Sequence, residues 1–437
     1  MSPQGSRSGR PLSVAVLMEL VRTPASGGQV KCWERFAEAA AAADPAELGI
    51  DLTVYVLGRR HHVEALSPRG RFVALHPVAS TALMSRKGGV DVSDVAPHHP
   101  GLARLLPHHD VWHMTHVLAF GATAARLRRR TRRHAGATHP GVTHPGLVAS
   151  VHTDVPALTY ALVRESVNRR LGRLPALRSL DPAALCESLV NRRRDRILTA
   201  CDRILVATPS QVPEMSALVG ADRVSRLGRG VDLDRFRPDP AARAALASYG
   251  VPVDRTLVLF AGRVDASKRV LLLAEALRRL RAEGRPVHLV IAGTGPETVR
   301  VSRLLGPDVT LVGVVPQQEL ARLFAGCDIF AFPSRSETIG NVVGEAMACG
   351  TPVVLPRGTN TNHWLARPSQ DGVLVDGDTP VEWATALETL IDDPAARAAM
   401  GRNATATVLT RHRGWGRVLM EDLLPVWRGV AASASGG

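Results

Sequence analysis

The stretch TLVLFAGRVDASKRVLLLAEALRRLRAEG, Thr256 to Gly284, contains a complete strand, loop and helix. Its first six residues are apolar apart from Thr256, which predicts a buried strand over Thr256–Ala261. From position 270 to position 277, apolar residues recur with the spacing of one helix face, and Gly284 follows the expected helix as its stop signal. The loop between strand and helix starts with glycine and carries two cations.

The same strand-then-helix pattern recurs along the chain. Alternating units with continuous apolar strands predict parallel sheets covered by helices on both faces. We therefore expect an α/β protein with two Rossmann-like, doubly wound parallel sheets. The expected strands are Ser13–Glu19, Asp51–Leu57, Phe72–Val78, Val111–Thr115, Leu147–Thr153, Arg203–Thr208, Thr256–Ala261, Val287–Ala292, Val309–Val312, Asp328–Phe332 and Pro352–Leu355.

The series is interrupted by a Pro/Asp-rich stretch, Gly228–Leu246, that indicates a linker. We expect an N-terminal domain over residues 11–237 and a C-terminal domain over residues 238–410. A helix over residues 411–430 is expected to cross back to the N-terminal domain. The Gly/Ser-rich ends, residues 1–10 and 431–437, are expected to be disordered.

The formal net charge of +14 comes almost entirely from arginine, because only three of the 54 basic residues are lysines. Two arginine runs, Arg126–His134 and Asn191–Arg196, lie on expected helices. They are expected to be solvated helix faces, with an anionic partner as the alternative. Nucleic acid is not the expected partner, because both runs lack the aromatic residues that would stack on bases.

Cysteine usage and hydropathy indicate a soluble cytoplasmic protein. The five cysteines are scattered without a CxxC pair, which argues against a disulfide framework or a zinc site. No apolar run is long enough to span a bilayer. A peripheral position on the inner face of the membrane remains compatible with the basic first half.

Two glutamates in PSRSETIGNVVGEAMACGTPVV, Pro333 to Val354, are the strongest candidates for ligand binding. Glu337 is expected in a strand-to-helix loop at the carboxyl edge of the sheet, and Glu345 inside the helix that begins near Gly340. At the rise of a helix the carboxylates would stand roughly 10 Å apart, so they could hold opposite ends of a hydroxyl-rich ligand. The amides of Gly340–Val342 would suit a phosphate between them. The alternative is an ordinary surface glutamate and a neighbour of the helix cap.

Two cations follow the strand of the opening stretch. Arg263 comes directly after Gly262, and Lys268 stands five residues later at the start of a helix. Two such cations can neutralise a diphosphate without a metal. No GxGxxG follows the first strand and no GxxxxGK[ST] occurs, which excludes dinucleotide and P-loop sites of those types.

At these residues the chain resembles the retaining GT-B glycosyltransferases of family 4. The likeness covers most of the chain and is strongest across residues 256–410. The motifs occur in the family's order: GGQ (Gly27–Gln29), VHTDVPALTY (Val151–Tyr160), GRGVDLDRFRP (Gly228–Pro238), AGRVDASK (Ala261–Lys268), AGTGP (Ala292–Pro296) and the stretch with the two glutamates.

The resemblance implies a GT-B fold, in which an acceptor-side N-terminal domain and a nucleotide-sugar-binding C-terminal domain face each other across a cleft. It also implies a role for each motif residue. Glu345 would bind the ribose, Glu337 the donor sugar, and Arg263 and Lys268 the diphosphate. The implied catalytic residues are Arg263, Lys268, Glu337 and His152, whose alternative is a satisfied histidine at a strand end. The implied donor-binding residues are Gly27, Gly28, Gly295, Gly340, Asn341, Val342 and Glu345.

The implied reaction is transfer of a hexose-type sugar with retained anomeric configuration, with no cofactor besides the nucleotide-sugar cosubstrate, UDP- or GDP-linked. No Asp-x-Asp stands at a suitable strand end, so a metal is not expected. The acceptor would be a lipid or a small molecule, and a lipid acceptor would allow contact with an anionic membrane. The segment RGTNTNHW, Arg357–Trp364, departs from the family pattern close to the donor sugar.

Two other functions use different parts of this pattern. A nucleotide-sugar epimerase or a phosphorylase would keep the fold, but the combination of Arg263, Lys268, Glu337 and Glu345 favours transfer. An arginine-rich nucleic-acid-binding protein is the remote alternative.

Overall fold

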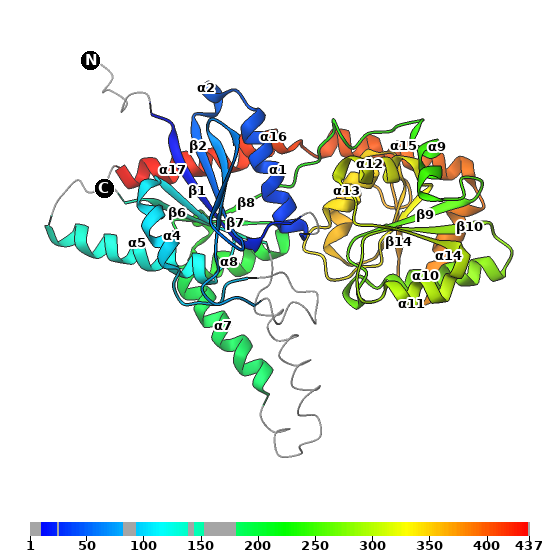
Figure 1. The fold of residues 1–437 in the computed structure, drawn as a ribbon, viewed down its shortest axis with the longest axis horizontal. Coiled ribbons are helices and arrows are strands. Elements are labelled where there is room, and N and C mark those ends of the chain that lie inside the picture. The colour runs from blue at the N-terminus through cyan, green and yellow to red at the C-terminus, as the bar shows by residue number, and fades with distance from the viewer. Residues whose placement is uncertain (1–9, 24–25, 82–92, 139–143, 153–180, 436–437) are drawn as a thin grey trace. The chain divides into compact units, whose positions relative to one another are not determined.

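The computed structural model describes residues 10–23, 26–81, 93–138, 144–152 and 181–435 of the 437-residue chain. The chain divides into two compact units, shown with their elements in Figure 1. The first unit combines Met1–Gly228 with Val418–Gly437, and the second is Arg229–Arg417. The break at Gly228 comes slightly before the boundary expected at residue 237.

The first unit is built on an eight-stranded sheet with the order β3-β4-β2-β1-β5-β6-β7-β8. All neighbouring strands are parallel except the β3–β4 pair, which is antiparallel. The strands are β1 (Leu12–Val21), β2 (Ile50–Leu57), β3 (His62–Ser67), β4 (Gly70–Leu75), β5 (Val111–Met114), β6 (Gly146–Val151), β7 (Arg203–Val206) and β8 (Val224–Arg226).

Helices cover both faces of this sheet, because right-handed crossovers from β1 to β2 and from β5 to β6 run in opposite directions. On β5, Trp112 and Met114 point to one face and His113 to the other. The helices are α1 (Gly28–Ala42), α2 (Pro45–Leu48), α4 (Pro100–Leu105), α5 (Ala119–Thr138), α7 (Pro182–Leu198), α8 (Val212–Val219) and α17 (Leu424–Ser435).

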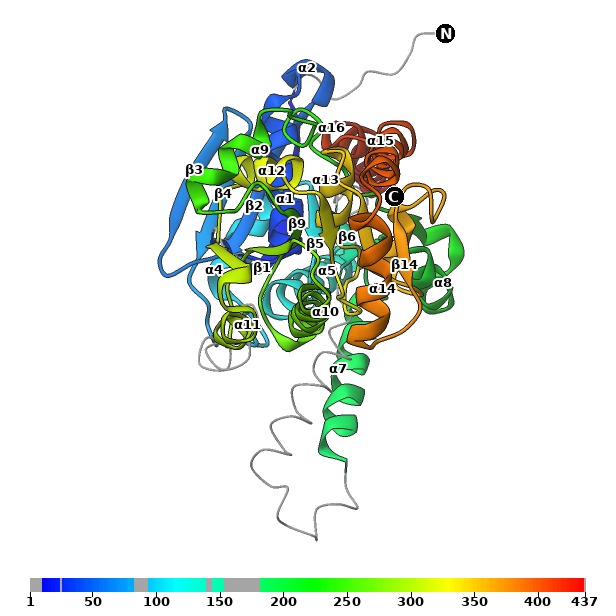
Figure 2. The ribbon, with the colours of Figure 1, turned by 90° about the vertical axis from the view of Figure 1, so that its right-hand side faces the viewer.

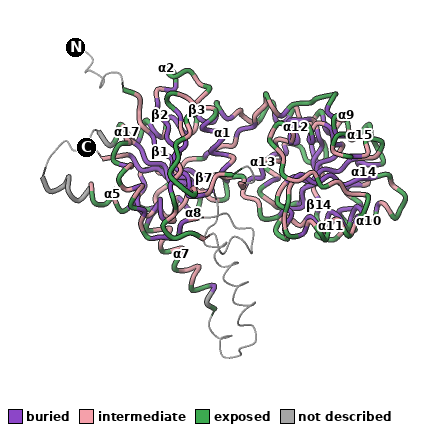
Figure 3. Tube along the Cα trace, in the orientation of Figure 1, coloured by how far each residue is buried: buried purple, intermediate pink, exposed green. Residues whose placement is uncertain are grey.

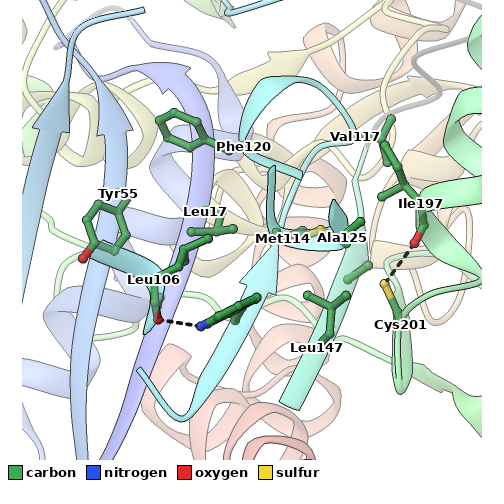
Figure 4. Packing of buried hydrophobic residues seen from close by; sticks show 14 of the residues in the cluster. Leu17, Tyr55, Leu106, Met114, Val117, Phe120, Ala125, Leu147, Ile197 and Cys201 are labelled. Carbon is green, nitrogen blue, oxygen red and sulfur yellow. Dashed lines mark hydrogen bonds between the residues drawn. The ribbon is translucent and has the colours of Figure 1, made fainter. Parts of the chain in front are cut away.

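The core of the first unit lies between the sheet and the α4, α5 and α7 helices. Figure 4 shows Leu17 and Met114 of the sheet beside Phe120 of α5, with Ile197 of α7 closing the layer. Buried Trp112 satisfies its indole N–H by donating to the Leu106 carbonyl oxygen at 2.8 Å. The strands that enter this core are those with uninterrupted apolar runs, as their hydrophobic pattern predicts.

The C-terminal segment packs on the first unit. After a π-helical turn, Leu419–Leu423, α17 packs against β5 and β6 of that unit. Helix α17 continues to Ser435, so residues 431–435, expected to be disordered, are helical. The reason is that buried Trp427 and Val430 anchor the helix, and the following residues are alanine and serine, which extend a helix at little cost.

The second unit is built on a six-stranded, wholly parallel sheet with the order β11-β10-β9-β12-β13-β14. The strands are β9 (Thr256–Ala261), β10 (Val287–Ala292), β11 (Val309–Gly313), β12 (Ile329–Ala331), β13 (Val353–Pro356) and β14 (Val373–Val375). The helices are α9 (Ala242–Ala245), α10 (Val270–Ala282), α11 (Thr298–Leu305), α12 (Gln317–Gly326), α13 (Asn341–Ala348), α14 (Pro380–Ile391), α15 (Pro394–Arg411) and α16 (Trp415–Val418).

The helices of this unit pack on one another as well as on the sheet. Helix α10 contacts both α11 and α14, an arrangement visible in Figure 2. In both units the central strands are buried, while exposed residues gather on the outer helix surfaces (Figure 3). None of the helices described combines the length and the apolar character that a membrane crossing requires.

The segment expected to be a linker, Gly228–Leu246, is packed into the second unit. Val231 donates its N–H to the Arg413 carbonyl oxygen at 3.0 Å, and Phe236 is buried. A Cβ on Gly230 would lie 2.6 Å from Trp415, so this glycine allows the close approach. Its Pro and Asp content therefore marks a packed irregular segment rather than a free connector.

Candidate functional site

The second sheet changes direction between β9 and β12. Strands β9, β10 and β11 follow each other toward one edge, and β12, β13 and β14 toward the other. In parallel α/β sheets, ligands bind at such a switch point, beside the carboxyl ends of the two strands. The loops that follow β9 and β12 hold Arg263, Lys268 and Glu337.

The loop after β9 is held in place by the loop after β10. Gly262 has φ +147°, a backbone conformation that favours glycine. Two residues later, the Val264 N–H donates to the Thr294 carbonyl oxygen at 3.0 Å. Arg263, between Gly262 and Val264, has a side chain that is 44% exposed, and its Nε lies 3.4 Å from a carboxylate oxygen of Asp265. The guanidinium therefore stands at the carboxyl edge of the sheet with capacity for further hydrogen bonds.

Gly295, predicted to bind the donor, belongs to the same pair of loops. A Cβ at this position would lie 2.3 Å from the Val264 carbonyl oxygen. Glycine is thus required here by the close packing of the two loops. This packing also orients the loop that carries Arg263.

Lys268 and Glu337 meet across the switch point. Lys268 ends a short 3₁₀ turn, Ala266–Lys268, whose first N–H groups are capped by Asp265, and its Nζ forms an ion pair with Glu337 Oε1. The two side chains are only 14% and 19% exposed. Ser334, which is buried, donates its hydroxyl to the same carboxylate oxygen at 3.3 Å.

Helix α13 begins directly after this pair. Its N-cap, Gly340, has φ +69°, and a Cβ there would lie 2.7 Å from Thr361. The first N–H groups of a helix have no partner within the helix, so the amides of Asn341 and Val342 suit an anion. Asn341 also keeps its Oδ1 buried without a hydrogen-bond partner among the described residues.

Glu345 lies on α13 one turn after Asn341, as the sequence predicts. It is half-buried. Burial first, and then the nearby Glu345 charge, raise the pKa of the Cys349 thiol above its usual range. Glu337 and Glu345 therefore belong to one strand-loop-helix unit, with the α13 N-terminus between them.

The segment with no family pattern, Arg357–Trp364, packs on this unit. The indole N–H of buried Trp364 donates to the Ile339 carbonyl oxygen at 3.0 Å, and Asn360 Nδ2 donates to the Glu337 carbonyl oxygen at 3.4 Å. Sequence reasoning placed this segment near the donor sugar but assigned it no residue. A tryptophan in an otherwise polar segment was the sequence signal that could have identified Trp364 as a packing residue.

The residues predicted in the first unit gather at the switch point of its own sheet, between β1 and β5. Gly27 is the N-cap of α1 and Gly28 its first residue. A Cβ on Gly28 would meet nothing within 4 Å, so packing does not require glycine there. Gln29 Nε2 donates to the Thr115 carbonyl oxygen after β5 at 3.2 Å, which ties the two sides together.

His152 follows β6 and is buried. Its Nε2 lies 2.7 Å from Ser150 Oγ, and its ring stands edge-on to Trp33 with centroids 6.3 Å apart. It lines a small cavity of about 30 Å³ with residues that follow β5, among them Thr115 and His116. The rest of its motif, residues 153–160, lies outside the described residues.

The structure thus places the predicted residues in two groups. Arg263, Lys268, Glu337, Gly340 and Glu345 gather at the second sheet, together with Gly295, Asn341 and Val342. Gly27, Gly28 and His152 belong to the first sheet.

Known proteins resemble this chain in sequence and in fold. Residues 255–393 match the family of group 1 glycosyl transferases. A D-inositol 3-phosphate glycosyltransferase of Xylanimonas cellulosilytica is 36% identical over 236 residues, 51% of this chain. The match spans only 55% of that relative, about half of its length.

Solved structures match almost the whole chain. Sucrose-phosphate synthase of Thermosynechococcus elongatus has a TM-score of 0.69 at 20% identity, covering 97% of this chain and all of that one. HepE of Anabaena, solved with UDP and glucose, has a TM-score of 0.64 at 17% identity, covering 98% of this chain and all of that one. At such identities the likeness establishes the fold, which is GT-B with two parallel-sheet units. The resemblance to the GT-B glycosyltransferases of family 4 is thereby confirmed, and residues 255–393 match the family of group 1 glycosyl transferases.

Proposed function

We propose that the chain transfers a hexose-type sugar from a nucleoside diphosphate sugar to a hydroxyl group of a small-molecule acceptor, with retained anomeric configuration. The observation that carries this proposal is the largely buried ion pair between Lys268 and Glu337 beside the N-terminus of α13. A cation, a carboxylate and free helix amides in one place suit a sugar joined to a diphosphate.

The second unit would bind the donor. Arg263 and Lys268 would hold the diphosphate and stabilise the negative charge that develops as its bond to the sugar breaks. Glu337 would accept hydrogen bonds from the sugar hydroxyls, and Glu345 from the ribose. Because two cations and a helix N-terminus neutralise the diphosphate, we propose that no metal is needed.

The chemical step is a front-face substitution at the anomeric carbon. The bond from that carbon to the diphosphate oxygen breaks, and the acceptor hydroxyl oxygen bonds to the same face of the sugar. The departing phosphate oxygen takes the hydroxyl proton. The configuration is retained, and the transition state resembles an oxocarbenium ion. In the first unit, His152, Gly27 and Gly28 are the residues that the family resemblance assigns to the acceptor and the reacting sugar.

The relatives narrow the substrates that we propose. HepE was solved with UDP and glucose, and the curated relatives are named for D-inositol 3-phosphate. We therefore propose a UDP-sugar donor and a phosphorylated polyol acceptor, in preference to a lipid.

A binding measurement tests the donor assignment. Thermal unfolding is followed with UDP-, GDP- and dTDP-sugars and with the free nucleotides. A ligand at about one hundred times its dissociation constant stabilises the folded protein by about 2.7 kcal/mol, a clear shift. We expect the uridine compounds to give that shift and Glu345→Gln to abolish it. No shift with any nucleotide would contradict the donor site.

A product measurement tests the reaction. The responding donor is incubated with an inositol phosphate, and NMR of the product reports the anomeric configuration. We expect the configuration of the donor to be kept and the rate to be unchanged by EDTA. An inverted product would contradict the mechanism, and an isomerised donor without transfer would indicate the epimerase alternative.

A further inference from the structure

The two arginine runs of the sequence meet in the first unit, where α5 and α7 pack against each other. A cavity of about 440 Å³ lies between the helices. Five arginines line it: Arg126, Arg129 and Arg130 from α5, and Arg193 and Arg196 from α7.

The floor of this cavity is apolar. Pro97, Ala122 and Ile197 complete its lining. Figure 4 shows Ala125 of α5 and Ile197 of α7 beside the apolar core, so the cavity borders that core. The cavity is therefore a hollow with an apolar base and a cationic rim.

Two other arginines of the same runs, Arg128 and Arg194, form ion pairs within the unit and do not line the cavity. Arg128 is buried and binds Asp202 through two contacts of 2.9 and 3.0 Å. Arg194 pairs with Asp195 at 2.9 Å and with Glu214 at 2.8 Å. Arg129 and Arg130 follow Arg126 by three and four residues, and Arg196 follows Arg193 by three, so the cavity arginines of each helix lie on one face.

Three of the five cavity arginines lack a charged partner within the described part of the chain. Arg126, Arg129 and Arg196 form no ion pair with any residue that the structure describes. Arg193 donates a long hydrogen bond of 3.4 Å to the Ala96 carbonyl oxygen, and its charge acts on the buried Glu19 carboxylate. Like charges three or four residues apart destabilise a helix, so a bound anion would relieve their repulsion.

His98, next to the lining residue Pro97, responds to this charge. Burial first, and then the Arg126 and Arg130 guanidinium groups, lower the pKa of His98 from its usual value. A positive potential therefore extends to the edge of the cavity. The same histidine can serve as a local reporter of a bound anion.

We propose that this cavity binds a small ligand carrying at least two phosphate groups. Guanidinium groups match phosphate oxygens in pairs, and a cavity of this size suits a small molecule. A hollow between two helices fits a compact anion better than a flat lipid surface. None of the lining residues belongs to the groups proposed for sugar transfer, so the assignment stands independently of the proposed function.

Calorimetric titration of the full chain with inorganic tripolyphosphate tests this site. The variant Arg126→Gln/Arg129→Gln/Arg196→Gln should bind at least about ten times more weakly. The control Arg59→Gln/Arg60→Gln/Arg104→Gln removes the same charge from exposed positions of the same unit, and it should bind within about twofold of wild type. Equal affinity of the cavity variant and the control would overturn the proposal.

Arg263→Gln separates this site from the proposed donor site. It should leave the cavity titration unchanged, and complete loss of binding in that variant would assign the tripolyphosphate to the donor site instead. NMR titration of the His98 ring gives a local readout, because bound anion should raise its pKa. His98→Gln identifies the resonance, and an unmoved His98 signal at saturation would contradict the site.

Two further arms test other anionic partners. Sedimentation with anionic and neutral vesicles and retention on DNA are compared for the wild type and the cavity variant. We expect no difference that depends on the cavity arginines. Cavity-dependent vesicle or DNA binding without tripolyphosphate binding would replace the small-ligand site with a docking surface.

Discussion

Lys268 and Glu337 form the residue pair on which the proposed chemistry depends. Each is the main charged partner that the structure shows for the other, and both are largely buried at the switch point. Without a donor the pair holds two reactive charges in position. When a donor is bound, the same charges can serve the diphosphate and the sugar, so the ion pair preorganises the site.

The substitution Glu337→Gln tests that role. It keeps the side-chain shape but removes the charge that pairs with Lys268 and accepts from sugar hydroxyls. We expect kcat/KM to fall on the order of a hundredfold, about 2.7 kcal/mol, and the thermal stability to fall as well, because Lys268 loses its charged partner while the fold stays intact. Initial rates and unfolding curves measure both. Glu275→Gln, on the exposed side of α10, should match the wild type. Wild-type turnover in the Glu337 variant would contradict the assignment.

His113 gives a pH prediction at the residue scale. Burial lowers its pKa to about 3, and Trp427 Nε1 donates to its Nδ1 at 3.0 Å, so that nitrogen carries no proton. In the unfolded chain the pKa returns to about 6.5. Between pH 6.5 and about pH 3, His113 is protonated in the unfolded state but not in the folded state. In this range the free energy of unfolding of the first unit falls by up to about 1.4 kcal/mol for each pH unit of acidification.

The comparison of His113→Gln with wild type isolates this effect. Buried Glu19 acts in the opposite sense, because burial raises its pKa and folding then favours its protonated form as the pH falls. Urea unfolding at pH 7.5, 6.0 and 5.0 should show a smaller loss of stability in His113→Gln than in wild type. The exposed control His62→Gln should keep the wild-type slope. Equal slopes for all three proteins would show that His113 is not held neutral.

At the scale of elements, α13 and the turn Asn360–Trp364 fit together through a glycine. A Cβ on Gly344 would lie 2.4 Å from the Trp364 ring, whose indole is fixed by its hydrogen bond to Ile339. Gly344→Ala should therefore displace the turn and destabilise the second unit by about 1–3 kcal/mol. Chemical denaturation measures this change.

Gly416→Ala is the matched control, because a Cβ there meets nothing within 4 Å. This substitution should leave the free energy of unfolding unchanged or raise it slightly, because alanine has a higher helix propensity than glycine. If Gly344→Ala were as stable as this control, the turn would not be packed on α13 as tightly as its contacts indicate. Transfer activity of Gly344→Ala should also fall, because Asn360 of the same turn holds the Glu337 backbone.

The elements that sequence predicted and those it missed differ in their place in the sheets. Every strand of four or more residues with a mainly apolar sequence was found. Three strands were missed, namely β3, β8 and β14, and each is an edge strand. Edge strands are covered on fewer sides, so β3 needs only a partly buried, polar sequence and β8 and β14 only three residues each. Such short or polar strands leave no periodic signal.

The candidate site divides in the same way. Arg263, Lys268, Glu337 and Glu345 lie on two strand-loop-helix units whose pattern is local, so sequence could name them. Ser334 and the turn with Asn360 act through packing between segments, which no local pattern records. The arginine cavity was missed because its two runs come from helices about 60 residues apart, and only the fold brings them together.

At the scale of the whole molecule, the C-terminal helix belongs to the first unit although the second unit precedes it in sequence. The sequence predicted a helix that crosses back to the first domain, and its side-chain packing explains why it is bound there. Trp427 is fully buried and donates to His113, and Val430 packs where a Cβ on Gly146 would lie 2.5 Å from its side chain. The first sheet is therefore covered by a helix that follows the whole second unit in sequence.

Trp427→Ala should destabilise the first unit by about 3–5 kcal/mol, because it leaves a large cavity and an unpaired His113. Since this contact lies wholly within the first unit, the second unit should keep its protection. Hydrogen exchange read peptide by peptide separates the units, with faster exchange expected in β5 and β6 and unchanged exchange in β9 and β10. Ser433→Ala, on the exposed side of α17, should alter neither. Equal loss of protection in both units would mean that they unfold as one, and that α17 stabilises the second unit as strongly as the first.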